Sequence, residues 1–267
     1  MKVCDCHVHL MGRVRPSDVV RAMDANGVDR ILAISRCERR SADRTRENLL
    51  EASVLVREAP DRIGALAWLN PAVPESADLA QEALEDLGFS GVKIIPDHWF
   101  AFEERFEPFW ERLDRMGAGV LFHTGILYTF EDGSRFCRPV YLEKLLHYPR
   151  IRFAMAHLAW PWCDECLAVM GRMKAAAEEG GFAWQSYIDT TPGTPPYIRR
   201  QALRNALDFC GPDRLLFGSD STLPGDLAHQ REVLESDLAI YREYGLSDAQ
   251  VDRILSGTAL GLFLPRR

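Results

Sequence analysis

The 267-residue sequence lacks any apolar run that approaches the roughly 18 residues needed to span a bilayer. It also lacks a long basic stretch, and its 39 acidic residues outnumber its 32 lysines and arginines to give a formal net charge of −7. An acidic chain of this kind is a poor candidate for binding nucleic acid or an anionic membrane surface. We therefore expect neither kind of partner.

The seven cysteines do not form a pattern that indicates disulfides. Their number is odd, and the single C-x-x-C pair, Cys163 and Cys166, has no second pair to complete a metal site. The first residues run directly into two histidines and leave no room for a secretory signal. Reduced thiols and the missing signal predict a cytoplasmic protein.

The sequence has no Gly/Ser-rich linker and no G-x-G-x-x-G motif, but it repeats short, β-prone apolar runs every 28 to 33 residues. This interval is close to the roughly 30 residues of a βα unit. The runs begin near Lys2, Arg30, Ile63, Gly91, Gly119, Arg152, Phe182 and Leu215. Most are continuous rather than alternating, which is typical of a parallel sheet covered on both faces. Eight such units predict one α/β domain over residues 1–267, a (β/α)8 TIM barrel with a helical extension after Ser221; a doubly wound sheet is the alternative.

Three segments between the runs, 17–25, 77–87 and 104–116, have apolar residues at helical spacing. Glycines follow them at positions 27, 88 and 117, as expected where helices end. These segments are predicted to be helices that cover the sheet.

Candidate catalytic residues lie at the ends of the apolar runs. Asp5, His7 and His9 occupy alternate positions of the first run, so on a regular strand all three would point to one face. That motif alone is weak, because an ordinary buried pair of histidines also satisfies it. The other polar residues at run ends are His123, His157 and Asp220. In a barrel the strand ends converge on one face, and imidazole with carboxylate favours Zn²⁺, with Mn²⁺ or Fe²⁺ as alternatives.

Lys93 lies in the middle of the fourth run, where a buried ammonium group needs a partner. Three interpretations stay open. The lysine could pair with a carboxylate, contact an anionic substrate, or be carboxylated and bridge two metal ions.

The loops after the second and fourth runs offer further candidates for substrate contact. Arg36 and Arg39 belong to five arginines in residues 36–46 that could bind a substrate carboxylate, or could form a solvated loop paired with acidic neighbours. Trp99 could line the pocket or simply pack in the interior. Asp189, at the end of the seventh run, is either a pocket wall or a helix cap.

Over its whole length the sequence resembles the amidohydrolase superfamily of metal-dependent TIM-barrel hydrolases, and within it the amidohydrolase-related branch. The resemblance is carried by residues 4–9 (CDCHVH), the later histidines 123 and 157, and residues 211–220 (GPDRLLFGSD). Residues 254–263 are similar to the closing helix of that branch, although the usual Asn-Ala reads Thr258-Ala259. The branch also contains non-oxidative decarboxylases of aromatic or unsaturated acids.

The resemblance implies four metal ligands: His7, His9, His123 and Asp220. It implies that His157 orients the reacting water or the substrate. Asp5 would lie behind the ligands, where it could hold the other ring nitrogen of one of them. Lys93 matches the position of the carboxylated lysine in two-metal members, whereas this branch mostly uses one metal or none.

These observations together predict a metal-dependent hydrolase with one Zn²⁺, acting on an amide, ester or lactone of a small, carboxylated substrate. Asp220 would accept the proton of a metal-activated water. A metal-dependent decarboxylase is the first alternative, and a metal-free or non-catalytic barrel is the second. Short loops favour a pocket open to water and hence hydrolysis. The substrate and the oligomeric state stay open, with a homodimer among the options.

Overall fold

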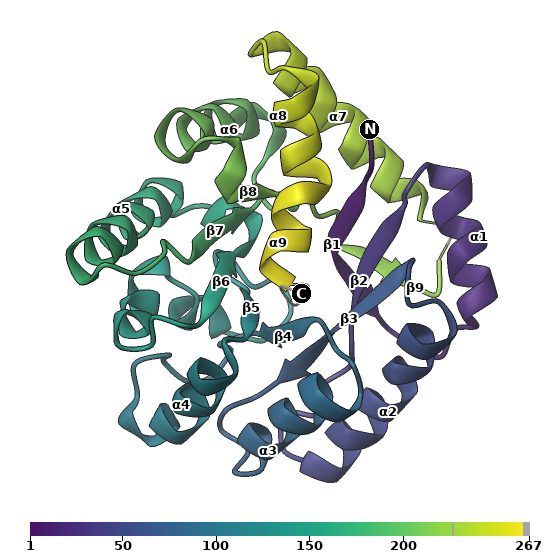
Figure 1. The fold of residues 1–267 in the computed structure, drawn as a ribbon, viewed down its shortest axis with the longest axis vertical. Coiled ribbons are helices and arrows are strands. Elements are labelled where there is room, and N and C mark those ends of the chain that lie inside the picture. The colour runs from purple at the N-terminus through teal and green to yellow at the C-terminus, as the bar shows by residue number, and fades with distance from the viewer. Residues whose placement is uncertain (226, 264–267) are drawn as a thin grey trace.

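The computed structural model describes residues 1–225 and 227–263. Nine strands within these residues form one parallel sheet in the order β8-β7-β6-β5-β4-β3-β2-β1-β9. They are β1 (Cys4–Leu10), β2 (Arg30–Ile34), β3 (Ile63–Leu69), β4 (Gly91–Ile94), β5 (Gly119–Phe122), β6 (Arg152–Met155), β7 (Ser186–Asp189), β8 (Leu215–Leu216) and β9 (Ser221–Leu223). The sheet curls into a ring with helices around its outside, an arrangement consistent with a TIM barrel (Figure 1).

The eighth predicted run is split into two strands that lie at the two edges of the sheet. β8 pairs with β7, and β9 pairs with β1. The residues between β8 and β9 also bond to β1. The amide of Cys6 donates to the carbonyl oxygen of Phe217 at 3.0 Å, and the amide of Asp220 donates to the carbonyl oxygen of His7 at 2.9 Å. One continuous segment, 215–223, therefore joins β7 to β1 and brings the two edges of the sheet together.

Most of the helices lie between successive strands, as the apolar spacing predicts, and the last of them follow β9. They are α1 (Pro16–Asn26), α2 (Ala42–Glu58), α3 (Ser76–Gln81), α4 (Glu107–Met116), α5 (Cys163–Gly180), α6 (Pro196–Cys210), α7 (Ala228–Glu243), α8 (Asp248–Asp252) and α9 (Thr258–Phe263). The three glycines predicted to end helices, at positions 27, 88 and 117, all have the left-handed backbone expected there. Within the described part of the chain, no helix is both long enough and apolar enough to cross a membrane.

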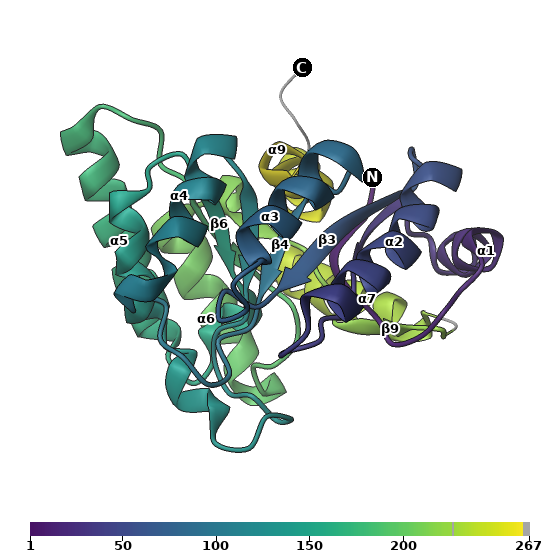
Figure 2. The same cartoon turned by 90° about the horizontal axis from the view of Figure 1, so that it is seen from below.

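The two largest apolar clusters hold the architecture together. The larger one lies between the strands and the outer helices, and includes Met23 of α1 and Trp110 of α4. The smaller one fills the interior of the ring and contains Leu121 of β5 together with Leu262 and Phe263 of α9. Burying a side chain of this size contributes about 1.5–3 kcal/mol. Helix α9 thus packs into one end of the ring, the end at which the N-terminus also lies (Figure 2).

A β-bulge in β1 changes which residues face the interior of the ring. Asp5 pairs with Ile31 and Val8 pairs with Ala33, so three steps along β1 match two steps along β2. The extra residue reverses the alternation of side chains, as bulges do. Asp5 consequently points outward and contacts α7, whereas His7 points into the ring. The expectation that both residues share one face of the strand is wrong for this reason.

Candidate metal centre and active site

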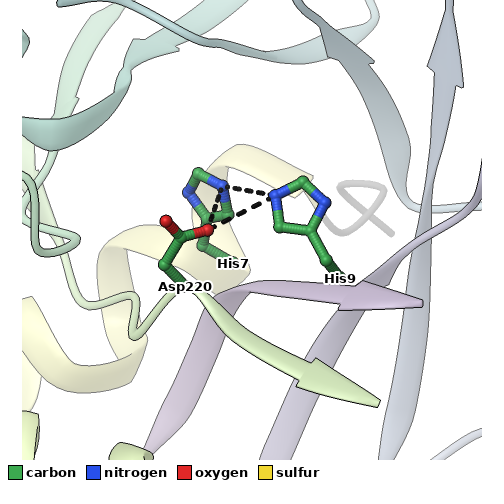
Figure 3. A group of neighbouring side chains, drawn as sticks. All are labelled: His7, His9 and Asp220. Carbon is green, nitrogen blue, oxygen red and sulfur yellow. Dashed lines mark hydrogen bonds and ion pairs between the residues drawn. The ribbon is translucent and has the colours of Figure 1, made fainter. Parts of the chain in front are cut away.

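Three potential metal ligands converge where β1 meets the segment between β8 and β9. The Nε2 atoms of His7 and His9 are 3.2 Å apart. Oδ1 of Asp220 lies 3.5 Å from His7 Nε2 and 3.4 Å from His9 Nε2. Figure 3 shows the two rings and the carboxylate pointing toward one another.

The spacing of these three atoms fits a bound transition metal. Ligands placed ~2.1 Å from a tetrahedral Zn²⁺ lie about 3.4 Å from one another. The three observed separations, 3.2, 3.4 and 3.5 Å, match that value. Burial, followed by the charge of Lys93, lowers the pKa of His9 to about 4 and holds that of His7 well below its ordinary value. Both rings are therefore neutral near pH 7, which is the form that binds a metal.

The ring of His7 is fixed from behind by β7. Its Nδ1 donates to Oδ2 of Asp189 at 2.7 Å, and Oγ1 of Thr191 lies 3.2 Å from the same nitrogen. Because the carboxylate holds Nδ1 protonated, the lone pair of His7 is at Nε2, which faces His9 and Asp220. The sequence predicts Asp189 only as a pocket wall or a helix cap. Its position at the end of a strand was the available signal, but its partner could not be found from sequence.

Asp5 does not hold a ligand ring, contrary to the expectation. Its Oδ1 accepts hydrogen bonds from the amides of His7 and Ser219, each at 3.0 Å, and its Oδ2 accepts one from Gln230 at 2.7 Å. Burial raises the pKa of this carboxyl to about 6, although its hydrogen bonds oppose the shift. Asp5 therefore fixes the backbone of two ligand-bearing segments, and the bulge explains why it cannot reach a ring.

Lys93 is fully buried on β4, and its Nζ lies 3.1 Å from His7 Nε2. Burial lowers the pKa of this amine to about 8. No carboxylate oxygen forms a salt bridge with it among the described residues, so the structural ion pair considered for it is absent there. Its position beside His7, a candidate metal ligand, is consistent with a role in the candidate metal site.

His123 and His157 form a second pair beside the first group. His157 Nε2 lies 3.2 Å from His123 Nδ1. The other nitrogen of each ring faces a carbonyl oxygen. His157 Nδ1 lies 2.7 Å from the carbonyl oxygen of Pro192, and His123 Nε2 lies 3.3 Å from the carbonyl oxygen of Ile126. Since a carbonyl oxygen only accepts, two neutral rings would present lone pairs to each other across the 3.2 Å gap. With both rings in these tautomers, the pair could share a proton or a cation. In the described residues His123 lies outside the His7, His9 and Asp220 group, and its role as a ligand stays a prediction.

Two site residues have an unusual backbone. His157 has φ of 62° and Asp220 has φ of 61°, in the left-handed region that non-glycine residues rarely adopt. Such conformations persist only where the surrounding structure enforces them, and they cluster at functional sites. For Asp220 this turn lies in the gap between β8 and β9 and aims the carboxylate at the histidines.

A cavity of about 440 Å³ opens onto this cluster. Its polar end is formed by His9, His123, His157 and Asp220. Its other walls are largely apolar and include four aromatic side chains: Trp68, Tyr128, Phe130 and Trp160. No lysine or arginine lines it within the part of the chain that the structure describes.

The three residues predicted to contact substrate do not line this cavity. Trp99 is fully buried and packs edge-on against Phe106, with ring centroids 5.2 Å apart, so its proposed contact with substrate is wrong. Arg36 pairs with Glu51 at 2.9 Å. Arg39 pairs with Asp97 at 2.5 Å and lies behind Phe130, with its guanidinium carbon 5.0 Å from the ring centroid. Both arginines are thus engaged outside the cavity, because acidic partners lie within their reach.

The sequence matches a known protein family over nearly its whole length. A family model described as amidohydrolase matches residues 4–264. The chain belongs to this amidohydrolase family. No curated protein sequence is significantly similar to it.

Solved structures of similar fold include enzymes with two different activities. A 5-carboxyvanillate decarboxylase from Sphingomonas paucimobilis is 16% identical, with a TM-score of 0.71 and 98% of each chain covered. A second such decarboxylase, from Novosphingobium aromaticivorans in complex with manganese, is 15% identical, with a TM-score of 0.67 over 92% of this chain and 79% of that one. A probable 2-pyrone-4,6-dicarboxylic acid hydrolase from Acinetobacter baumannii is 14% identical, with a TM-score of 0.65 over 98% and 99%. At these identities the likeness shows a shared fold.

Proposed function

We propose that this protein is a metal-dependent hydrolase that cleaves an amide, ester or lactone bond in a small substrate. The observation that carries the proposal is the convergence of two neutral imidazoles and one carboxylate at separations of 3.2 to 3.5 Å, at the end of an otherwise apolar cavity. His7, His9 and Asp220 would hold the ion, with His123 as a further candidate. Zn²⁺ is the first choice, with Mn²⁺ or Fe²⁺ as alternatives. When bound, such an ion lowers the pKa of water toward ~7 and polarises a substrate carbonyl.

The remaining steps fall to side chains of the chain itself. Asp220 is partly exposed to the cavity, with 40% of its side chain accessible, so it can accept a proton from a water at its free oxygen. The ring centroids of His157 and His7 are 5.2 Å apart, and a protonated His157 would share its Nε2 proton with His123. Transferring that proton to the leaving group would complete the hydrolysis. Asp220 is thus the proposed base, and His157 the proposed acid or orienting group.

Lys93 allows a two-metal variant of the same proposal. Its amine lies next to His7. The facing nitrogens of His123 and His157 could also contact a cation. A carboxylated Lys93 would add a bridging carboxylate between the two groups. With a free amine, Lys93 would not reach a substrate in this cavity, because it is fully buried and does not line the walls.

Decarboxylation of an aromatic or unsaturated acid is the second candidate, and the cavity walls favour it. The ring of Trp68 lies edge-on to those of His9 and Phe130, with centroid separations of 6.1 and 6.3 Å. A flat substrate ring next to the proposed metal ligands would therefore lie against an aromatic surface. An apolar wall of this kind also keeps water from a carbanion-like species. Two of the three solved structures named above are decarboxylases of an aromatic acid.

One experiment separates the two reactions. The metal-loaded enzyme is screened against lactones, amides and aromatic or unsaturated carboxylic acids in ¹⁸O-labelled water, while released CO₂ and ¹⁸O in the product are both measured. Hydrolysis predicts ¹⁸O in the product and no CO₂. Stoichiometric CO₂ without ¹⁸O would establish the decarboxylase instead. The Asp220→Asn variant, which the proposal expects to be inactive, is the control for contaminating enzymes.

We also propose a cytoplasmic location. All seven cysteines are free in the structure, and two of them, Cys4 and Cys6, lie in the interior of the ring. Free thiols are typical of a reducing compartment. Testing is direct, because fractionation of cells that produce the tagged protein reports its compartment.

A further inference from the structure

Helix α7 lies outside the ring, yet two of its buried side chains reach toward the metal centre. Gln230 and Asp237 are both fully buried, and their separation of seven residues, two helical turns, places them on one face of the helix. That face is turned toward the ring. Gln230 contacts Asp5 of β1, and Asp237 contacts Arg199 of α6. Neither residue has a role in the chemistry proposed above.

The first contact runs from Asp237 to the residues that hold His7. The guanidinium of Arg199, in the first turn of α6, donates to both oxygens of Asp237 at 2.9 and 2.7 Å. Its Nη2 also donates to the carbonyl oxygen of Thr190 at 2.6 Å. Thr190 lies between Asp189 and Thr191, the two residues whose side chains contact His7 Nδ1. One buried ion pair therefore anchors the short backbone segment that orients the ring.

The second contact fixes the backbone of the same ligand. Gln230 donates from Nε2 to Asp5 Oδ2 at 2.7 Å, and Asp5 Oδ1 in turn accepts the amides of His7 and Ser219. Ser219 directly precedes Asp220, so this carboxylate joins the two ligand-bearing segments. Both contacts from α7 thus end on His7, one at its ring and one at its amide.

From this convergence we propose that Asp237, through Arg199, and Gln230, through Asp5, are positioning residues that set the orientation of His7 for metal binding. The proposal rests on the proposed metal centre. Groups behind metal ligands typically change metal affinity by 10- to 100-fold when they are removed. A pair that served only to stabilise the fold would not change affinity in a variant that stays folded.

The test removes the ion pair without leaving a buried charge. Arg199→Met/Asp237→Leu replaces it with apolar side chains, a change that is often neutral for stability. The matched control is Arg200→Gln/Glu243→Gln, which removes an exposed ion pair between the same two helices. For each protein we would measure the melting temperature in EDTA, the Kd for Zn²⁺ by competition with a chelator, and the NMR signal of the His7 Nδ1 proton in the metal-free form.

We expect the buried double variant to melt within a few degrees of wild type, to bind Zn²⁺ about 10- to 100-fold more weakly, and to lose the protected His7 Nδ1 proton. The control should match wild type in all three measurements. Gln230→Leu tests the second contact in the same way and should also weaken Zn²⁺ binding. A folded double variant with wild-type Zn²⁺ affinity and an intact His7 signal would overturn the proposal.

Two further outcomes are informative. If the double variant does not fold, Arg199→Lys replaces it, because a lysine keeps a cation beside Asp237 but cannot also span to Thr190. Unchanged Zn²⁺ affinity in that variant would refute the positioning role, and a several-fold loss would support it. If wild type itself binds no Zn²⁺, the proposed function fails. Loss of the His7 proton signal in the double variant would then still support positioning of His7.

Discussion

Replacing Gly218 with alanine should disturb the metal centre from the side that faces β7. Gly218 lies in the gap between β8 and β9, directly against the residues that hold His7. A methyl group built there would lie 2.8 Å from Asp189 Oδ1 and 2.8 Å from Cβ of His7, and closer still to the hydroxyl oxygen of Thr191. Carbon atoms pack at about 3.5–4.0 Å, so all three side chains would have to move.

The size of the effect follows from that overlap. Forcing a methyl group into a packed interior costs about 1–3 kcal/mol, which lowers the melting temperature of a protein of this size by roughly 2–10 °C. Since two of the displaced groups contact His7 Nδ1, Zn²⁺ affinity should also fall, by about 10-fold or more. Both quantities are measured on one sample series, by thermal melting in EDTA and by chelator competition.

Two further variants make this prediction specific. Gly261→Ala, in α9, is the control, because a methyl group there meets nothing within 4 Å, and it should be neutral or slightly stabilising. Adding Thr191→Ala to Gly218→Ala removes the worst overlap and should restore part of the lost stability, a non-additive result. If Gly218→Ala keeps the wild-type melting temperature and Zn²⁺ affinity, the close packing behind His7 described above is wrong.

Three other predictions test the site more directly. The protein purified without chelator should contain close to one equivalent of Zn or Mn; about two equivalents would indicate that Lys93 is carboxylated, and none after reconstitution would refute the metal centre. His7→Ala should lose the metal, whereas His157→Ala should keep it and lose about 10²- to 10⁴-fold in turnover, so equal metal loss in both would make His157 a ligand. Trp68→Ala should raise KM by about 2- to 10-fold with little change in kcat, since it removes an aromatic wall of the cavity, and an unchanged KM for an aromatic substrate would exclude that contact.

The strands were predictable because their signal is local. A parallel strand buried on both faces needs a continuous apolar run, and the positions of those runs alone indicated the order of the βα units. The convergence of His7, His9 and Asp220 followed from the rule that strand ends meet at one face of a barrel. The seventh strand was placed too early, near Phe182, whereas β7 begins at Ser186.

The supports of the site were not predictable, because each depends on a single tertiary contact. The bulge in β1 shifts the pairing with β2 by one residue, and the pattern of apolar residues does not reveal it. Because of the bulge, Asp5 faces α7 instead of the ring interior. Asp189 is one of several polar residues at strand ends, and only the fold shows that it faces His7 Nδ1. Trp99 and Arg39 were assigned by position in a loop, and loops are where side-chain direction is least constrained by pattern.

The position of the proposed metal centre also follows from how the ring is closed. Asp220 can reach the histidines only because the eighth strand is interrupted and its backbone turns left-handed there. That interruption leaves β8 with only two residues. His7 and His9 come from β1, on the other side of the same junction, so a bound ion would join the two sides. The contacts of Asp5 with the amides of His7 and Ser219 already span that junction without a metal. The same local irregularity therefore supplies the proposed catalytic carboxylate and requires the hydrogen bonds that hold the two sides of the junction together.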